Sequence, residues 1–186
     1  PDLDEVRAEW MTPDDRLVNA AGMQWRVRET GPEDAAAIVL IHGFSHSLEA
    51  FEAVSVELDS EYRVIRFDLP GHALTGPRED AAYSVDDTLA QMTTLLDEIA
   101  PDTFAIGGNS LGGLLAWRYA AANPERVTDL VLISPGGYPN LGVGDEPAPV
   151  PAQVSLYLTT APQASVQAAT AALYADPSRL SGADVE

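Results

Sequence analysis

The amino-acid sequence predicts an α/β fold with a doubly wound, mostly parallel sheet. Short apolar and β-branched runs alternate with segments of helical spacing between residues 36 and 133, and this alternation is typical of a parallel sheet covered by helices on both faces. The run Ala36–Ile41 is apolar throughout, as expected of a strand buried on both faces. Ligands of such sheets bind outside the carboxyl ends of the strands, so a site is expected on the loops that follow them.

The first predicted elements are a hairpin, a strand, a helix and a second strand. β-Branched and aromatic residues between Arg16 and Thr30 surround Ala21-Gly22, which predicts a β-hairpin leading the sheet. The apolar run Ala36–Ile41 forms the next strand. Apolar residues at helical spacing predict a helix over Leu48–Leu58, and Tyr62–Phe67 is the strand that follows it.

The next helix is predicted to begin at Ser84. Asp86 and Asp87 occupy its first turn, where carboxylates suit the positive end of the helix dipole, and Pro101 ends it. The remaining predicted elements are a strand, a helix and a strand, at Thr103–Ile106, Leu111–Ala122 and Val127–Ile133.

After Ser134 the composition changes. Residues 135–151 are dense in glycine and proline, and the alanine-rich residues beyond them show helical spacing at 154–158 and 165–174. This part of the chain is expected to leave the sheet.

The charge of the chain is strongly negative. The chain has 29 acidic and 10 basic residues, the basic ones all arginine, and its formal net charge is −19. Such a surface repels phosphate backbones and anionic membranes, so neither nucleic acid nor a membrane is an expected partner. Salt adaptation and biased codon usage both fit the lysine-free composition. The chain has no cysteine and no long apolar span, and we expect a cytoplasmic protein without a metal or other cofactor.

Ser110 is the candidate nucleophile. It lies at the centre of Gly108-Asn109-Ser110-Leu111-Gly112, a Gly-x-Ser-x-Gly sequence that follows a predicted strand and opens a predicted helix. A sharp turn there holds the serine in a strained conformation, and side chains at positions 108 and 112 would collide with neighbouring backbone. The turn aims the start of the following helix at the reacting centre, so the Leu111 N–H is a candidate oxyanion donor.

A second oxyanion donor is expected from His42-Gly43-Phe44, at the end of the strand Ala36–Ile41. We assign this donor to the Phe44 N–H. Gly43 allows substrate to approach the backbone closely, and Asn109 either contacts substrate or fixes the turn.

Three motifs in order resemble the α/β-hydrolase superfamily, in its cap-bearing branch of serine esterases and carbon–carbon bond hydrolases. They are His42-Gly43-Phe44, Asp68-Leu69-Pro70-Gly71 and the glycine-rich turn at 108–113, and the resemblance runs from about Leu17 to Pro139. It implies that residues 1–139 form the N-terminal part of the hydrolase core and residues 140–186 part of a helical cap.

The sequence departs from the family pattern in two places. Ala73 replaces the second glycine of the loop after Asp68, and no histidine follows position 72. The family order places a catalytic acid and histidine after the serine. We therefore expect the fold to lack its last strands, leaving an open apolar edge, and a C-terminal portion or second polypeptide to supply the acid and the histidine.

The three histidines of the chain have simpler interpretations than catalysis. We expect the His42 ring to form hydrogen bonds within the oxyanion loop and His46 and His72 to be solvated or packed in loops. Asp68, at a strand end, is expected to accept backbone N–H groups in its own turn.

The resemblance implies a serine hydrolase acting on a small-molecule carboxylic ester or related acyl compound through an acyl-enzyme at Ser110. Gly-Asn-Ser followed by one residue and two glycines also resembles carbon–carbon bond hydrolases of β-diketone-like substrates. A third hypothesis is a non-catalytic module of the same fold that binds a ligand or partner.

Overall fold

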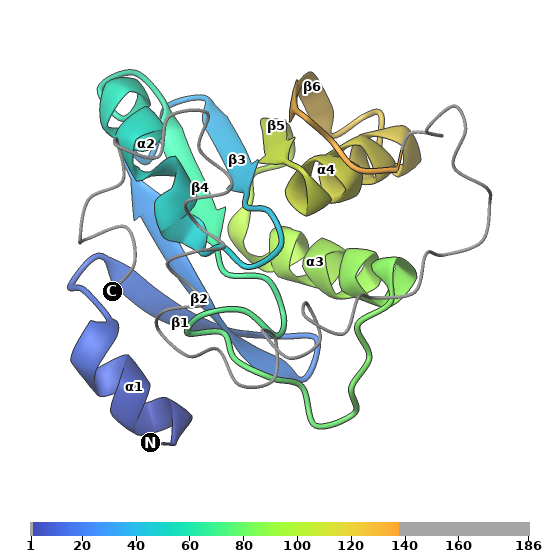
Figure 1. Cartoon of the computed structure of the whole chain (residues 1–186). Coiled ribbons are helices and arrows are strands. Elements are labelled where there is room, and N and C mark those ends of the chain that lie inside the picture. Colours follow the sequence, from blue (N-terminus) through green and yellow to red (C-terminus); the bar gives the residue numbers. More distant parts are fainter. Residues whose placement is uncertain (1, 138–186) are drawn as a thin grey trace, which may run out of the picture. The chain divides into compact units, whose positions relative to one another are not determined.

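The computed structural model describes residues 2–137 (Figure 1), all within the first of two compact units of the chain, Pro1–Tyr138. The predicted cap region, 140–186, lies outside the described residues. The elements follow one another as α1 (Leu3–Trp10), β1 (Asp15–Ala20), β2 (Met23–Thr30), β3 (Ala37–Ile41), a 3-10 turn η1 (Leu48–Phe51), α2 (Glu52–Leu58), β4 (Arg63–Phe67), α3 (Val85–Ile99), β5 (Phe104–Asn109), α4 (Leu111–Ala122) and β6 (Val127–Ile133).

The described strands form one mostly parallel sheet in the order β1-β2-β4-β3-β5-β6. Strands β3, β4, β5 and β6 run parallel to one another, and β2 joins β4 antiparallel. The predicted hairpin is confirmed: β1 pairs with β2 through a turn in which Ala21 and Gly22 both have positive φ, 51° and 75°. The carboxyl ends of β3, β4 and β5 thus meet at one edge of the sheet.

Both faces of the sheet are covered, as predicted. Because side chains alternate along a strand, the side chains of neighbouring β3 residues point to opposite faces of the sheet. Val39 and Ile41 pack in the main core with residues of α3 and α4, such as Leu95 and Leu115. Leu40 packs on the other face, in a smaller cluster with Phe51 and Val64.

The helix α1 is an element that the sequence did not predict. It has only eight residues, four of them charged, and so short a segment gives too few apolar positions to show a helical period. A capping box starts it, because the Asp2 carboxylate accepts from Glu5 N–H and the Glu5 side chain accepts from Asp2 N–H.

The other predicted elements are confirmed within about two residues, except at two ends. The predicted helix 48–58 begins as the 3-10 turn η1, and β5 continues three residues beyond the predicted end at Ile106, through Gly107 and Gly108 to Asn109. Glycine weakens a strand signal in sequence, but here it lets β5 run close to its neighbours.

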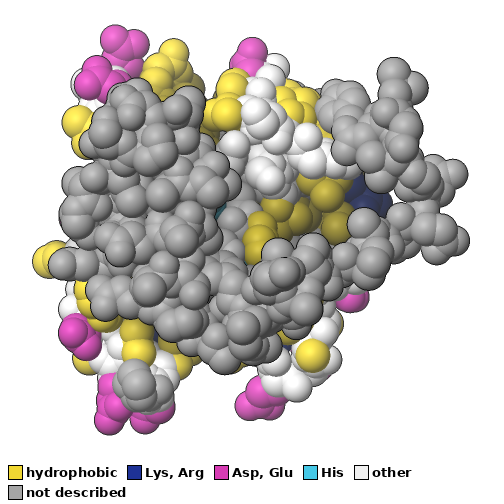
Figure 2. All heavy atoms as spheres, viewed as in Figure 1, with side chains coloured by type: hydrophobic (Ala, Val, Ile, Leu, Met, Phe, Trp, Pro, Cys, Tyr) yellow, Lys and Arg dark blue, Asp and Glu magenta, His cyan; other side chains and the backbone are white. Residues whose placement is uncertain are grey.

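Strand β6 is an edge of the described sheet. It pairs with β5 on one side, and Leu130, Val131 and Ile133 are 41%, 53% and 45% exposed. Hydrophobic side chains are visible on the surface in this region (Figure 2). No helix among residues 2–137 has the length and apolarity needed to cross a bilayer.

Candidate active site

Ser110 occupies a strained turn between β5 and α4. Its backbone has φ 51° and ψ −112°, a region that L-residues rarely adopt and that is associated with functional sites. The expected collisions at the flanking glycines are confirmed. A Cβ on Gly112 would lie 2.0 Å from Ile41 O, and a Cβ on Gly108 would lie 2.3 Å from the carbonyl carbon of Gly112. The turn therefore needs glycine at both positions, and Ser110 itself is exposed.

The strained turn is held in place by hydrogen bonds to the chain that leaves β6. Ser110 N–H donates to Ile133 O at 3.1 Å, and Ser110 O accepts from Gly136 N–H at 2.8 Å. The Asn109 amide Nδ2 also donates to Ile133 O at 3.1 Å. This bond assigns Asn109 a part in fixing the turn.

The loop after β3 lies directly against the nucleophile turn. A Cβ on Gly43 would lie 2.9 Å from Asn109 Oδ1 and 3.4 Å from Ser110 Cβ. The structure thus brings Gly43, Asn109 and Ser110 together, with no space for a side chain at position 43.

The two candidate oxyanion donors flank this contact. Leu111 is the first residue of α4, where helix geometry offers the N–H no acceptor. Phe44 follows Gly43 and is 54% exposed. Both residues line the same cavity, described below.

His42 joins the loop after β3 to the loop after β4. Its fully buried ring accepts from Leu69 N–H through Nε2 at 2.9 Å and donates from Nδ1 to Gly43 O at 2.7 Å. The expected hydrogen bond within the oxyanion loop is confirmed, and the bond to Leu69 adds a second loop. Burial lowers the pKa of His42 to about 4, although the hydrogen bond to Gly43 opposes the shift. The ring is therefore neutral at pH 7, with both nitrogens in use.

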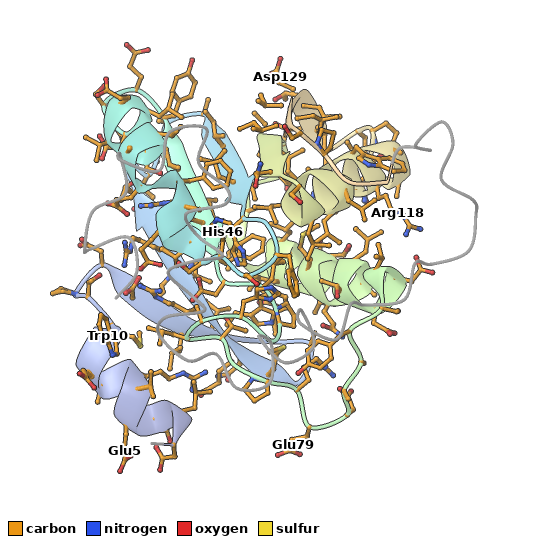
Figure 3. The ribbon with its side chains drawn as sticks, in the orientation of Figure 1. Glu5, Trp10, His46, Glu79, Arg118 and Asp129 are labelled. Atoms are coloured by element: carbon orange, nitrogen blue, oxygen red, sulfur yellow. The ribbon has the colours of Figure 1, made fainter. Side chains whose placement is uncertain are left out.

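His46 and His72 lie on loops, as expected. His46 follows β3 (Figure 3), is exposed, and donates from Nδ1 to Phe44 O at 2.9 Å. His72 donates from Nδ1 to Pro70 O at 3.0 Å, and its ring meets the Phe44 ring edge-on at 5.7 Å between centroids.

Asp68 organises the loop after β4. Its buried carboxylate accepts from Leu74 N–H at 3.1 Å, which confirms the expected bond within its own turn. It also accepts from Leu48 N–H at 2.8 Å and from Arg26 Nη1 at 3.3 Å. Burial raises the pKa of Asp68 despite these donors. Asp68 thus ties together β2, η1 and the loop after β4.

A cavity of about 360 Å³ opens beside the two candidate oxyanion donors. Phe44, Leu69 and Leu111 of its wall belong to motifs identified in the sequence, whereas the part between Pro77 and Thr88 was not predicted, because it comes from an irregular loop and from the start of α3. The lining residues are Phe44, Leu69, Pro70, Gly71, His72, Pro77, Tyr83, Val85, Thr88 and Leu111. The apolar start of α3 at Val85 was the one signal that could have pointed to the part that was not predicted. Among residues 2–137, no group of three or more His, Asp or Glu side chains could hold a metal ion.

Comparison with known proteins assigns the chain to a family. Residues 36–184 match the family model described as the alpha/beta hydrolase fold. The chain is 36% identical over 97 residues to the pimeloyl-[acyl-carrier protein] methyl ester esterase of Nitrosomonas europaea, covering 52% of this chain and 36% of the relative. It is 35% identical over 99 residues to an esterase of Mycobacterium tuberculosis, covering 53% of this chain and 33% of the relative.

A solved structure shows the same fold. Cfl2 from Burkholderia cenocepacia matches with a TM-score of 0.77 at 24% identity, over 92% of this chain and 63% of the neighbour. The chain spans about a third of the length of both relatives. The family model covers most of the chain, and its fold is the one described above; the chain belongs to the alpha/beta hydrolase fold family.

Proposed function

We propose that the chain carries the nucleophile and the oxyanion hole of a serine hydrolase acting on a carboxylic ester or related acyl compound. The observation that carries the proposal is the strained Ser110 turn, with Gly43 packed against the Ser110 side chain and α4 beginning at Leu111. Relatives named as esterases support ester substrates.

In the proposed reaction, Ser110 Oγ attacks the substrate carbonyl carbon and gives its proton to a base. The N–H groups of Phe44 and Leu111 donate to the oxyanion, and removal of one such donor typically costs about 10²–10³ in rate. The tetrahedral intermediate collapses to the acyl-enzyme as the leaving alcohol takes the proton. Water then attacks the acyl carbonyl and releases the acid.

The base is proposed to come from a C-terminal portion or second polypeptide. His42 is buried, neutral and bonded through both ring nitrogens, so it has no lone pair for Ser110. The exposed apolar residues of β6 support an attachment surface for further strands, because an open apolar edge favours strand pairing. Native mass spectrometry tests this partner: a single 19.8 kDa species with full esterase activity would contradict it.

A fluorophosphonate probe tests the nucleophile on the full chain together with any native partner. We expect labelling at Ser110, its loss in Ser110→Ala, and unchanged labelling in Ser60→Ala, a matched substitution of an exposed serine. Equal labelling of Ser110→Ala would refute the proposal. Absence of labelling would favour the non-catalytic binding module.

A carbon–carbon bond hydrolase is the second candidate, favoured by Asn109 beside the nucleophile. Its substrate would be β-diketone-like. Release of two carbon fragments from such a compound, with no hydrolysis of simple esters, would favour it.

A further inference from the structure

The cavity beside the two candidate oxyanion donors has a wall without carboxylate or guanidinium groups. Its lining includes Phe44 and Leu111, together with Tyr83 just before α3 and with Val85 and Thr88 in the first turn of α3. None of its lining residues is Asp, Glu or Arg. Its volume, about 360 Å³, is at the low end of ligand pockets, which suits one portion of a substrate rather than a large molecule.

Two polar atoms of the wall residues are already engaged within the protein. His72 Nδ1 donates to Pro70 O at 3.0 Å, and the Tyr83 hydroxyl accepts from Arg78 N–H. Apolar side chains make up most of the wall.

The arginines do not supply a countercharge either. Each of the nine arginines that the structure describes lies within 4.0 Å of a carboxylate. Arg78 is the nearest of them in sequence to Tyr83. Its guanidinium binds both carboxylate oxygens of Asp80 and donates to Ala21 O at 3.0 Å. Its positive charge is therefore already matched.

We infer that this cavity binds an uncharged, apolar acyl or alkyl portion of the substrate and rejects an anionic one. The inference rests on the proposed function, since it places that portion next to the Ser110 turn. An anionic chain end in the cavity would lose its hydration without gaining an arginine partner, and the net charge of −19 would repel it at longer range.

Isothermal titration calorimetry of the full chain with two matched probes tests the inference. Octanamide is neutral, and suberamic acid has the same chain length with a carboxylate at its far end. We expect octanamide to bind at least about tenfold more tightly. Equal affinity, tighter binding of suberamic acid, or no binding of octanamide at millimolar concentration would each overturn the inference.

The variant Val85→Lys tests whether the two probes bind in this cavity. A lysine at this wall position should weaken octanamide and strengthen suberamic acid, so that the preference falls or reverses. Val54→Lys is the matched control on α2, where Val54 is 45% exposed and outside the cavity, and should leave both affinities unchanged. Where Val85→Lys fails to fold, Tyr83→Lys replaces it, since Tyr83 is 43% exposed. A lysine variant that leaves the preference unchanged contradicts the assignment.

Calorimetry tests the cavity assignment and probe labelling tests the proposed reaction, so either proposal can be refuted while the other stands. Octanamide binding requires no chemistry at Ser110, so a folded chain that binds octanamide but never labels refutes the proposed reaction and keeps the cavity assignment. A chain that labels at Ser110 but binds both amides equally refutes the cavity assignment alone.

Discussion

His42 Nε2 accepts a hydrogen bond from the backbone N–H of Leu69 at 2.9 Å. Because Nδ1 of the same ring donates to Gly43 O at 2.7 Å, one neutral imidazole holds the oxyanion loop against the wall of the cavity. Protonation of Nε2 would remove the acceptor that Leu69 uses. The bond therefore makes the geometry of the site depend on pH.

Acid should destabilise the fold through His42. Its pKa is about 4 in the folded chain, whereas the ordinary histidine pKa is 6.5, so the unfolded chain binds more protons between these values. Its stabilising contribution is complete above pH 6.5 and is lost as the pH falls toward 4, by roughly 3 kcal/mol in total. Urea unfolding of wild type and His42→Gln at pH 7, 5.5 and 4.5 measures this. The variant should show a shallower pH dependence, and His46→Gln, at an exposed site, the wild-type one.

Gly43→Ala should reduce reactivity at Ser110 while the fold persists. The new methyl would lie 2.9 Å from Asn109 Oδ1 and 3.4 Å from Ser110 Cβ, so the Asn109 amide, which donates to Ile133 O and helps to fix the turn, must shift. We expect the rate of fluorophosphonate labelling to fall by roughly 10²-fold. Gly22→Ala is the control, because its Cβ meets nothing within 4 Å and lies in the hairpin turn. Equal rates in the two variants would count against the assigned oxyanion loop.

Gly112→Ala should destabilise the whole domain. A Cβ there would lie 2.0 Å from Ile41 O and 2.5 Å from His42 O, both backbone atoms of β3 and its loop. Backbone cannot rotate away as a side chain can, so we expect a loss of about 3 kcal/mol or more. Thermal unfolding measures it against Gly136→Ala, where the nearest atom is 3.5 Å away. A melting temperature like that of the control would show that α4 can shift freely.

Arg7→Met should loosen the loop that walls the cavity. Arg7 Nε donates to Leu74 O at 2.8 Å and Nη2 to Thr75 O at 3.3 Å, and the side chain is nearly buried. Its removal leaves both carbonyls without a donor, at a cost of about 1–3 kcal/mol. Hydrogen exchange of Gly71 and Gly76, whose N–H groups bond within the loop, should accelerate. Arg16→Met, at a half-exposed ion pair, should leave their exchange unchanged.

The sequence predicted those features that depend on local pattern. The strands, the helix α4 and the turn at Ser110 follow from apolar runs and from glycines at fixed spacing, and the His42 and Asp68 turns from short-range bonds. One part of the cavity wall was not predicted, because Pro77, Tyr83 and their neighbours come from an irregular loop placed by tertiary contacts. The Arg7 contact joins residues 67 positions apart, and no periodicity reports such a pairing.

Asp15 is the centre of a buried ionic cluster on the first strands of the sheet. Burial alone would raise the pKa of Asp15, but hydrogen bonds from Arg28, Arg26 and the Thr12 backbone hold it well below its usual range. Its carboxylate accepts from Arg28 Nε at 2.8 Å and from Arg26 Nη2 at 2.9 Å. Glu49 and Asp68 also face Arg26, so the cluster extends to the loop that walls the cavity.

Asp15→Asn should therefore cost about 3–5 kcal/mol, because it leaves two buried guanidinium groups with one carboxylate fewer. Asp97→Asn removes the carboxylate of an exposed pair with Arg126 and should cost less than about 1 kcal/mol. Urea unfolding at pH 7 compares the two variants. Equal costs would mean that Glu49 and Glu52, which already pair with Arg26 and Arg28, match their charge without Asp15. A large difference, with slower labelling of Ser110 in Asp15→Asn alone, would show that the cluster supports the site through Arg26 and Asp68.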